Sequence, residues 1–180
     1  MEEKGLIDPE MVANASGVIP GMRVADLGCG RTAYFLFPMA RAVGNTGTAY
    51  GVDIQPQVLE AVGATARQLG LINVETVQAD LSQYGATPIK EGSLDAVFII
   101  NNLVDFPTFT EMFREAVRLS RSKGRVVVVD WISGPVLYAP DVDHRAEKMA
   151  VEGLADRLGL NLVREFSPGK YFYGLVFEKK

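Results

Sequence analysis

Cysteine, histidine and tryptophan each occur only once among the 180 residues of the chain. A single thiol cannot form an intramolecular disulfide, so we expect a reducing compartment and predict that the protein is cytoplasmic. A single histidine excludes a metal site built from several histidines, and we expect no bound metal. Cys29 is the lone cysteine, and we interpret it as a small residue in a tight turn rather than as a nucleophile.

The sequence also lacks long apolar runs and a strong charge of either sign. No stretch approaches the roughly 18–20 apolar residues needed to cross a bilayer, so we predict no membrane span. The N-terminal segment MEEKGLIDPE is acidic and has no apolar centre of the kind found in signal peptides. The formal net charge is −4, which disfavours nucleic acid as a partner because phosphates attract basic surfaces. Nothing in the sequence indicates an oligomeric state.

What is present is an alternation of short apolar runs with longer amphipathic segments, a pattern typical of βαβ units around a parallel sheet. Pro38 falls inside the first predicted helix, where it should kink the helix or delay its start. Gly70 should end the second helix, and Ser122-Lys123-Gly124 should end the third. We predict strands over 22–26, 49–54, 73–78, 94–100 and 125–130, and helices over 32–43, 56–70, around 112–119 and over 142–158.

The C-terminal third of the chain has a different pattern. Predicted strands over 160–166 and 171–178 are joined by Ser167-Pro168-Gly169, and strands joined by so short a turn must be antiparallel. We therefore predict the α/β fold class, with a single doubly wound, mostly parallel seven-stranded sheet that ends in an antiparallel hairpin. Residues 1–20 are expected to form an N-terminal helical extension with a helix over 9–15 near the site, and residues 21–180 the domain itself.

The strongest candidate site is Val24-Ala25-Asp26-Leu27-Gly28-Cys29-Gly30, which leads from a strand into a helix. Gly28 and Gly30 allow a tight turn and let a ligand approach the backbone closely. The N–H groups at the start of the following helix can receive an anionic or carboxylate group.

Two further acids end the next two strands. Asp53 ends the second strand, and an acid about 20 residues after such a turn commonly accepts hydrogen bonds from ribose hydroxyls. Asp80 ends the third strand and could accept a hydrogen bond from an adenine amino group. Each residue alone also fits a plain turn or cap. Their succession at strand ends on one sheet edge instead favours a shared binding crevice.

This order of Asp-x-Gly-x-Gly and two later acids resembles the class I S-adenosylmethionine-dependent methyltransferases. The resemblance extends from about residue 20 to 180. Within this family, the chain is loosely similar to the ubiquinone/menaquinone-type small-molecule methyltransferases. It implies S-adenosylmethionine as the cofactor and transfer of its methyl group to an acceptor. We expect that acceptor to be a small molecule.

The resemblance also implies roles for single residues. Gly28 and Gly30 are expected against the methionine part of the cofactor, with Asp26 helping to orient its amino group through water or the loop backbone. The other expected cofactor contacts are Asp53 with the ribose hydroxyls, Ile54 with the adenine ring, Asp80 with the adenine amino group, Leu81 beside it, and Asn101 at the methyl group. Many family members carry a third glycine where this chain has Arg31-Thr32-Ala33. We expect Thr32 to cap the helix and Ala33 to replace that glycine.

Methyl transfer from a sulfonium needs in-line positioning, and it needs a general base only when the acceptor is protonated. Our candidate catalytic residues are Asn101 and Asp105. Asp105 fits a base, and it fits equally a cap for a helix that begins near Pro107. The expected walls of the acceptor crevice are Asn101, Asn102, Asp105, Phe106, Trp131 and Tyr138, with Tyr34 closing over the cofactor or packing in the core.

Two other functions stay open at this point. Gly28 to Ala33 also fits the G-x-G-x-x-G/A fingerprint of a Rossmann-type NAD(P)-binding oxidoreductase. Asp26, the short chain and the terminal hairpin argue against that reading. The second alternative is a non-catalytic cofactor-binding module, which the absence of an obvious catalytic base keeps open.

Overall fold

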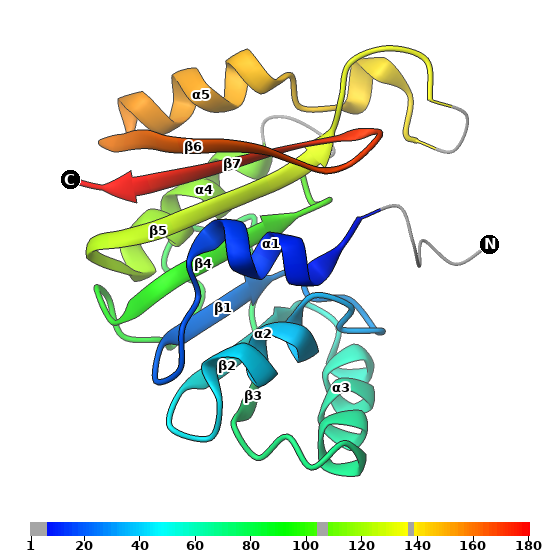
Figure 1. Ribbon diagram of the computed structural model, residues 1–180, viewed down its shortest axis with the longest axis vertical. Helices are drawn as coiled ribbons and strands as arrows, with labels where there is room; N and C mark the ends of the chain where they lie inside the picture. The colour runs from blue at the N-terminus through cyan, green and yellow to red at the C-terminus, as the bar shows by residue number, and fades with distance from the viewer. Residues whose placement is uncertain (1–6, 104–107, 137–138) are drawn as a thin grey trace.

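The computed structural model describes residues 7–103, 108–136 and 139–180. Its helices and strands follow one another in the alternating order that the sequence predicts (Figure 1). In chain order they are α1 Pro9–Ser16, β1 Arg23–Leu27, α2 Leu36–Val43, β2 Thr48–Asp53, α3 Pro56–Gln68, β3 Val74–Gln78, β4 Leu94–Ile100, α4 Thr108–Leu119, β5 Ser120–Trp131, the short 3₁₀ helix η1 Val142–His144, α5 Lys148–Arg157, β6 Leu160–Gly169 and β7 Phe172–Lys179.

The strands form one seven-stranded sheet in the order β3-β2-β1-β4-β5-β7-β6. The strands from β3 to β5 pair in parallel, whereas β7 is antiparallel to both β5 and β6. The predicted fold class is therefore confirmed. The strand order reverses between β1 and β4, and α/β sheets of this kind bind ligands at that point, outside the carboxyl ends of the strands.

Helices cover both faces of the sheet (Figure 1). Apolar side chains of α1, α2 and α3 pack on one face, and those of α4 and α5 pack on the other. The central strand β4 contributes to both cores, because Phe98 faces the first and Val97 and Ile99 face the second. Burial on both faces explains why β4 is a nearly continuous apolar run, and its bounds match the prediction.

The helix predicted over 32–43 begins only at Leu36, so Thr32 does not cap it as expected. Pro38 explains the delay, because a proline fits the first turn of a helix but not its interior. Ala33, just upstream, has a φ of +47° and is fully buried. This left-handed conformation is the one a glycine adopts most easily, which is consistent with the expectation that Ala33 stands where many family members carry a third glycine.

The helix predicted over 142–158 was wrong in its first half. Only Val142–His144 forms a 3₁₀ turn, and α5 begins at Lys148. Arg145 between them is extended, and its guanidinium donates hydrogen bonds to the carbonyls of Pro140 (2.6 Å), Gly134 (2.7 Å) and Ile132 (3.1 Å). These bonds hold the segment after β5 against the arginine, and the extended backbone at Arg145 interrupts the helix.

Two turns also differ from the prediction. The third helix ends at Leu119, within the predicted bounds, so it ends before Ser122-Lys123-Gly124. These three residues lie in β5 instead, where Lys123 has a φ of +60° and the pairing with β4 is irregular. At the hairpin, β6 continues through Ser167-Pro168-Gly169 with an irregular register after Phe166, and the turn falls at Lys170 and Tyr171. The backbone N–H of Asp8 donates to the Pro168 carbonyl at 3.1 Å, which ties the chain before α1 to this end of β6.

Within the described ranges, every helix is too short or too polar to cross a lipid bilayer.

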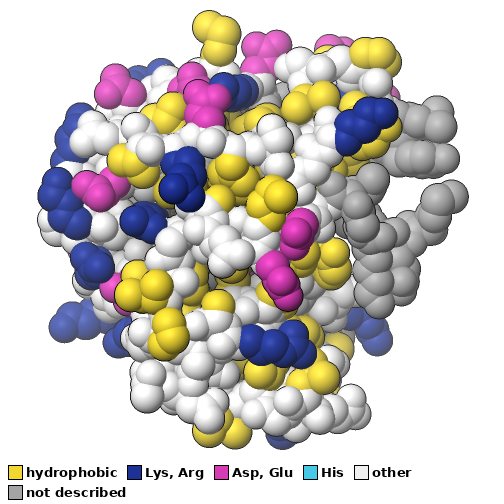
Figure 2. Space-filling view, viewed as in Figure 1, with side chains coloured by type: hydrophobic (Ala, Val, Ile, Leu, Met, Phe, Trp, Pro, Cys, Tyr) yellow, Lys and Arg dark blue, Asp and Glu magenta, His cyan; other side chains and the backbone are white. Residues whose placement is uncertain are grey.

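On the face shown in Figure 2, Lys and Arg side chains are most frequent along the left margin, and Asp and Glu side chains lie among them. That margin is the end of the sheet where β5 begins and β7 ends, opposite the carboxyl ends of the parallel strands.

Candidate active site

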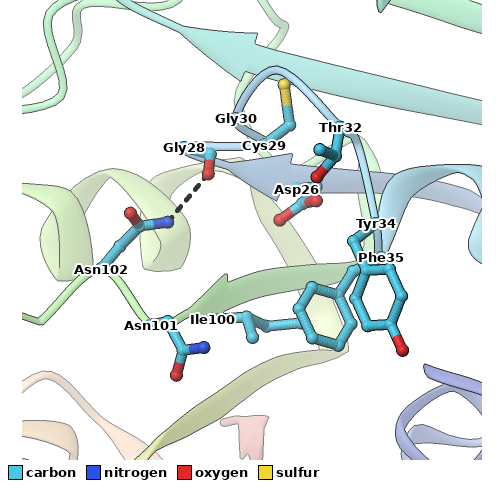
Figure 3. Close-up of a pocket in the computed structure, with 10 residues that line it drawn as sticks. All are labelled: Asp26, Gly28, Cys29, Gly30, Thr32, Tyr34, Phe35, Ile100, Asn101 and Asn102. Carbon is cyan, nitrogen blue, oxygen red and sulfur yellow. Dashed lines mark hydrogen bonds between the residues drawn. The ribbon is translucent and has the colours of Figure 1, made fainter. Parts of the chain in front are cut away.

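A cavity of about 280 Å³ opens where the sheet order reverses, between the ends of β1 and β4. Figure 3 shows the residues that line it. They are Asp26, Gly28, Cys29, Gly30, Thr32, Tyr34 and Phe35 from the end of β1 and the turn after it, and Ile100, Asn101 and Asn102 from the end of β4. The cavity therefore brings together Asp26, Gly28, Gly30 and Asn101, which the sequence analysis assigned to one site.

Backbone hydrogen bonds to β2 hold the glycine turn in place. The backbone N–H groups of Gly28 and Cys29 both donate to the Val52 carbonyl, at 2.8 and 3.0 Å. Gly28 and Gly30 have φ values of +79° and +62°, in the region that favours glycine. A Cβ built on Gly30 would meet no atom within 4 Å, so the backbone there is open to an approaching ligand.

Asp26 is 2% exposed at the end of β1. Burial, and then the nearby negative charge of Asp53, raise the pKa of Asp26 to about 7. Within the described residues no side chain or backbone group donates a hydrogen bond to this carboxylate. A buried charge without a partner is costly, so the wall of this cavity favours a cationic ligand.

Asp53 lies next to the turn rather than in the cavity wall. Its carboxylate accepts hydrogen bonds from the backbone N–H groups of Gly30 at 3.2 Å and Gln55 at 3.0 Å. The acid predicted to bind ribose thus also supports the glycine turn, and its oxygens retain further lone pairs for a ligand.

The residues predicted around the adenine lie outside the cavity wall. Asp80 accepts hydrogen bonds from the Ser82 hydroxyl (2.6 Å), the Ser82 N–H (3.0 Å) and the Gln83 amide (3.0 Å). The bond from the Ser82 hydroxyl is the main reason that the pKa of Asp80 is lowered. Leu81 is buried in the core, and Ile54 is 54% exposed. The Ala79 N–H donates to the Asp53 carbonyl at 3.1 Å, so the ends of β2 and β3 are adjacent.

Asn101 and Asn102 have different roles at the end of β4. The Asn102 amide donates to the carbonyls of Leu27 (2.8 Å) and Gly28 (3.0 Å), joining the two sides of the cavity (Figure 3). Asn101 has a φ of +54°, and its side-chain oxygen is buried without a hydrogen-bond partner. A strained backbone and an unsatisfied buried oxygen are features that binding sites retain.

Comparison with known proteins identifies the family. A family profile described as a methyltransferase domain matches residues 19–152. The chain belongs to this methyltransferase family. It is 34% identical over 134 residues to nocamycin O-methyltransferase of Saccharothrix syringae, and the matched region covers 69% of this chain and 46% of that protein. It is 30% identical over 114 residues to demethylmenaquinone methyltransferase of Lactococcus lactis, and the matched region covers 63% of this chain and 44% of that protein.

This methyltransferase domain spans less than half the length of those two curated relatives. Among solved structures it is similar to a SAM-dependent methyltransferase from Aquifex aeolicus, with a TM-score of 0.87 and 23% identity over 97% of this chain and 91% of that chain. It is also similar to the [4+2]-cyclase SpnF, with a TM-score of 0.78 and 15% identity over 95% of this chain and 80% of that chain. Such similarity shows the fold, and the predicted resemblance to class I methyltransferases is confirmed.

The methyltransferase domain also contains residues that sequence reasoning missed or misplaced. Ile100 and Phe35 line the cavity, although their apolar character pointed only to the core. Trp131, predicted in the acceptor wall, is 4% exposed and packs with Phe172 at 4.2 Å between ring centroids. Asp105, Phe106 and Tyr138 lie outside the described residues.

Asp130 is a second buried acid that the sequence analysis did not single out. Burial raises its pKa to about 6, although the N–H groups of Trp131 (2.8 Å) and Leu103 (3.2 Å) donate to it and Arg145 lies nearby. The carboxylate thus joins the end of β5 to the loop after β4. An acid directly after four valines was the available clue, because few charged residues occur at the end of a buried strand.

Cys29 lies in the turn but serves packing. Its Sγ would be 3.2 Å from a Cβ on Gly51, and Figure 3 shows its side chain directed away from the other residues of the cavity. Burial raises the pKa of the Cys29 thiol above its ordinary value. A thiol of raised pKa holds little thiolate, so Cys29 is unsuited to nucleophilic catalysis.

Proposed function

We propose that this chain binds S-adenosylmethionine and transfers its methyl group to a small-molecule acceptor. The observation that carries the proposal is the buried Asp26 carboxylate, which meets no donor among the described residues beside an open glycine turn. S-adenosylmethionine supplies an activated methyl group on a cationic sulfonium and also carries an ammonium group. A charge-assisted hydrogen bond from that ammonium satisfies Asp26, so the cavity fits this cofactor.

The remaining contacts divide between the two halves of the cofactor. Gly28 and Gly30 hold the methionine half against the open backbone of the turn. The adenosine half extends over the adjacent ends of β2 and β3, where Asp53 accepts from the ribose hydroxyls and the exposed Ile54 packs on the adenine. Asp80, with Leu81 beside it, accepts from the adenine amino group in addition to its bonds within the turn.

Asn101 is the residue we place beside the transferred methyl group, because its side-chain oxygen is buried there without a partner. Asp105 is the proposed base for acceptors that carry a proton on the attacking atom. Since the leaving group is already activated, the described residues act mainly by binding, orienting and excluding water.

The chemistry of the acceptor is supported by the relatives. They are named for nocamycin, demethylmenaquinone and aklanonic acid, which are small organic molecules rather than macromolecules. The net charge of −4 also disfavours a nucleic-acid acceptor. The single cysteine supports a reducing compartment, and we propose the cytoplasm.

Isothermal titration calorimetry with S-adenosylmethionine tests the function directly. Asp26→Asn should weaken binding by about 10- to 100-fold, since hydrogen bonds to charged groups contribute roughly 1.5–3 kcal/mol. Asp156→Asn, on the exposed face of α5, is the matched control and should bind as the unmodified chain does. Binding of NADH without binding of S-adenosylmethionine would favour an oxidoreductase, and cofactor binding without methyl transfer to any acceptor in a broad screen would favour a non-catalytic module.

A further inference from the structure

Asp130 lies at the end of β5, next to the turn that follows β4. Its carboxylate uses both oxygens, because Oδ1 accepts the Trp131 N–H at 2.8 Å and Oδ2 accepts the Leu103 N–H at 3.2 Å. Asp130 is 1% exposed and lies outside the wall of the cavity beside Asp26. It therefore meets no ligand there, and contacts instead the backbone behind one side of the cavity.

The turn that Asp130 contacts, residues 101–103, contributes two residues to the cavity wall. Asn101 and Asn102 both line the cavity, and the Asn102 amide also holds the glycine turn across it (Figure 3). Asn101 has a φ of +54°. Asparagine adopts this left-handed region more readily than most residues, yet the conformation is still strained and persists only where neighbouring contacts maintain it.

Two backbone donors of the turn are bound to β5. The Asn101 N–H donates to the Val129 carbonyl at 2.9 Å, and the Leu103 N–H beyond it donates to Asp130. Together these bonds set the direction in which the chain leaves β4. Leu103 is 1% exposed, so water cannot easily replace the bond that Asp130 provides.

The groups around Asp130 leave its carboxylate to the backbone. Tyr173 lies opposite Asp130 in the pairing of β5 with β7, but its hydroxyl donates to a backbone carbonyl at 3.0 Å. The positive charge of Arg145 favours the ionised carboxylate. Within the described part of the chain, the hydrogen bonds to Asp130 come from the N–H groups of Trp131 and Leu103.

We infer that Asp130 is a positioning residue of the cofactor site, and that its carboxylate holds the strained turn that keeps Asn101 in the cavity wall. The inference rests on the proposed function, which places Asn101 beside the transferred methyl group. S-adenosylhomocysteine, the product left after transfer, lacks this methyl group and the sulfonium charge but keeps the rest of the cofactor. Asp130 therefore affects the binding of S-adenosylmethionine more than the binding of S-adenosylhomocysteine.

Asp130→Asn tests the contact with the turn at almost constant side-chain volume. An amide has one acceptor oxygen in place of two, so it cannot accept both N–H groups in the same way. The bond to Trp131 is the shorter, and we expect the amide to keep that bond and to turn its NH₂ group toward Leu103. Hydrogen exchange at the Leu103 amide should become about fivefold faster, which corresponds to about 1 kcal/mol.

Calorimetry with S-adenosylmethionine and S-adenosylhomocysteine tests the role toward the cofactor. Asp130→Asn should lower the affinity for S-adenosylmethionine about fivefold relative to that for S-adenosylhomocysteine, and Asn101→Ala should lower this ratio by a similar factor. The double variant should show no further fall in the ratio, because both substitutions remove the same interaction. A purely structural role of Asp130 would weaken both ligands alike.

Glu115→Gln is the matched control for general destabilisation. Glu115 is also a buried acid that accepts backbone N–H groups, in this case those of Gly85 (2.8 Å) and Thr87 (3.2 Å) in the loop between β3 and β4. It lies outside the cavity wall. The control variant should exchange faster at Gly85 and Thr87 and unfold more easily, with the ratio of the two affinities unchanged.

Three results would overturn the inference: an unchanged ratio in Asp130→Asn, an equal fall in Glu115→Gln, or additive falls in the double variant. If the unmodified chain binds S-adenosylmethionine and the ratio does not respond to Asp130→Asn, only the role of Asp130 is wrong. If the unmodified chain binds neither ligand, the proposed function is wrong and the role toward the cofactor falls with it.

Discussion

The side-chain amide of Asn102 fills the space that a Cβ on Gly28 would occupy. Its nitrogen would overlap such a Cβ, and it donates to the Gly28 carbonyl at 3.0 Å. A side chain at residue 28 therefore has to displace the contact that joins the ends of β1 and β4, and it must also adopt a positive φ. Glycine is required here by both its size and its backbone freedom.

The two glycines of the turn should respond differently to alanine. Gly28→Ala should destabilise the chain by about 2–4 kcal/mol, through the clash with Asn102 and the strained φ, measured by urea unfolding. Gly30→Ala meets no atom within 4 Å and should cost only about 1 kcal/mol. It should also weaken S-adenosylmethionine binding, because its methyl group would enter the open space that we assign to the cofactor. Similar unfolding midpoints for the two variants would contradict this account.

The raised pKa of Asp26 predicts a pH-dependent stability. The pKa is about 7 in the folded chain and 3.8 when unperturbed, so the folded state binds a proton more readily than the unfolded state. The resulting stabilisation is fully present below pH 3.8 and is lost as the pH rises to about 7. Asp26→Asn should therefore be more stable than the unmodified, ligand-free chain at pH 8, by roughly 2–4 kcal/mol, and equally stable near pH 4. Thermal melts across this range provide the measurement.

The affinity for the cofactor should rise with pH, whereas the stability of the ligand-free chain falls. A cationic ligand favours the charged form of Asp26, so binding below pH 7 releases a proton and affinity rises with pH, by up to about tenfold per unit. Calorimetry in buffers of different ionisation enthalpy measures the released proton. In Asp26→Asn this release should disappear. An unchanged proton release in the variant would assign the effect to another group.

Glu115 of α4 should be among the residues most sensitive to substitution. It is fully buried, and it accepts hydrogen bonds from Gly85 (2.8 Å), the Thr87 hydroxyl (2.7 Å) and Arg118 (2.6 and 2.8 Å). Burial alone would raise the pKa of Glu115, but the bonds from Arg118 and Thr87 outweigh it and the pKa is lowered. Glu115→Ala should cost about 3–5 kcal/mol, because it leaves Arg118 unpaired. Glu111→Ala, which breaks a more exposed pair with Arg114, should cost less than about 1 kcal/mol in the same unfolding experiment.

Arg145 should control the order of the segment after β5. Arg145→Met removes the hydrogen bonds to the carbonyls of Ile132, Gly134 and Pro140, and hydrogen exchange should become faster around residues 132–136. Loss of this charge should also raise the pKa of Asp130 further, because Arg145 partly opposes the effect of burial. Arg157→Met, on the exposed side of α5, is the control and should leave exchange in this segment unchanged.

Much of the fold could be predicted because each central element has a strong local pattern. The apolar run of β4 and the proline that begins α3 fix those elements within the sequence itself. The errors fall where tertiary contacts override local preference. The Arg145 side chain donates to carbonyls of the preceding segment, and its extended backbone interrupts a helical pattern. The hairpin turn falls at Lys170 and Tyr171, and the Pro168 carbonyl before it accepts a hydrogen bond from Asp8.

The candidate site was predictable in its centre and less so at its edges. Asp26 and the glycines follow from their place at a strand end, and the cavity contains them. Whether Asp80 reaches a ligand stays a prediction, since its carboxylate forms the local turn that its sequence context equally suggested. The contacts of Tyr34 with Ile7 and of Asp8 with Pro168 left no trace in the sequence, because they join segments that only the folded chain brings together.

Tyr34 lines the cavity beside Asp26 and donates its hydroxyl to the Ile7 carbonyl at 3.2 Å. A ligand that changes the position of this ring therefore also changes a contact of the segment before α1. By thermodynamic reciprocity, whatever factor that contact adds to the affinity for the ligand, the ligand adds to the stability of the contact.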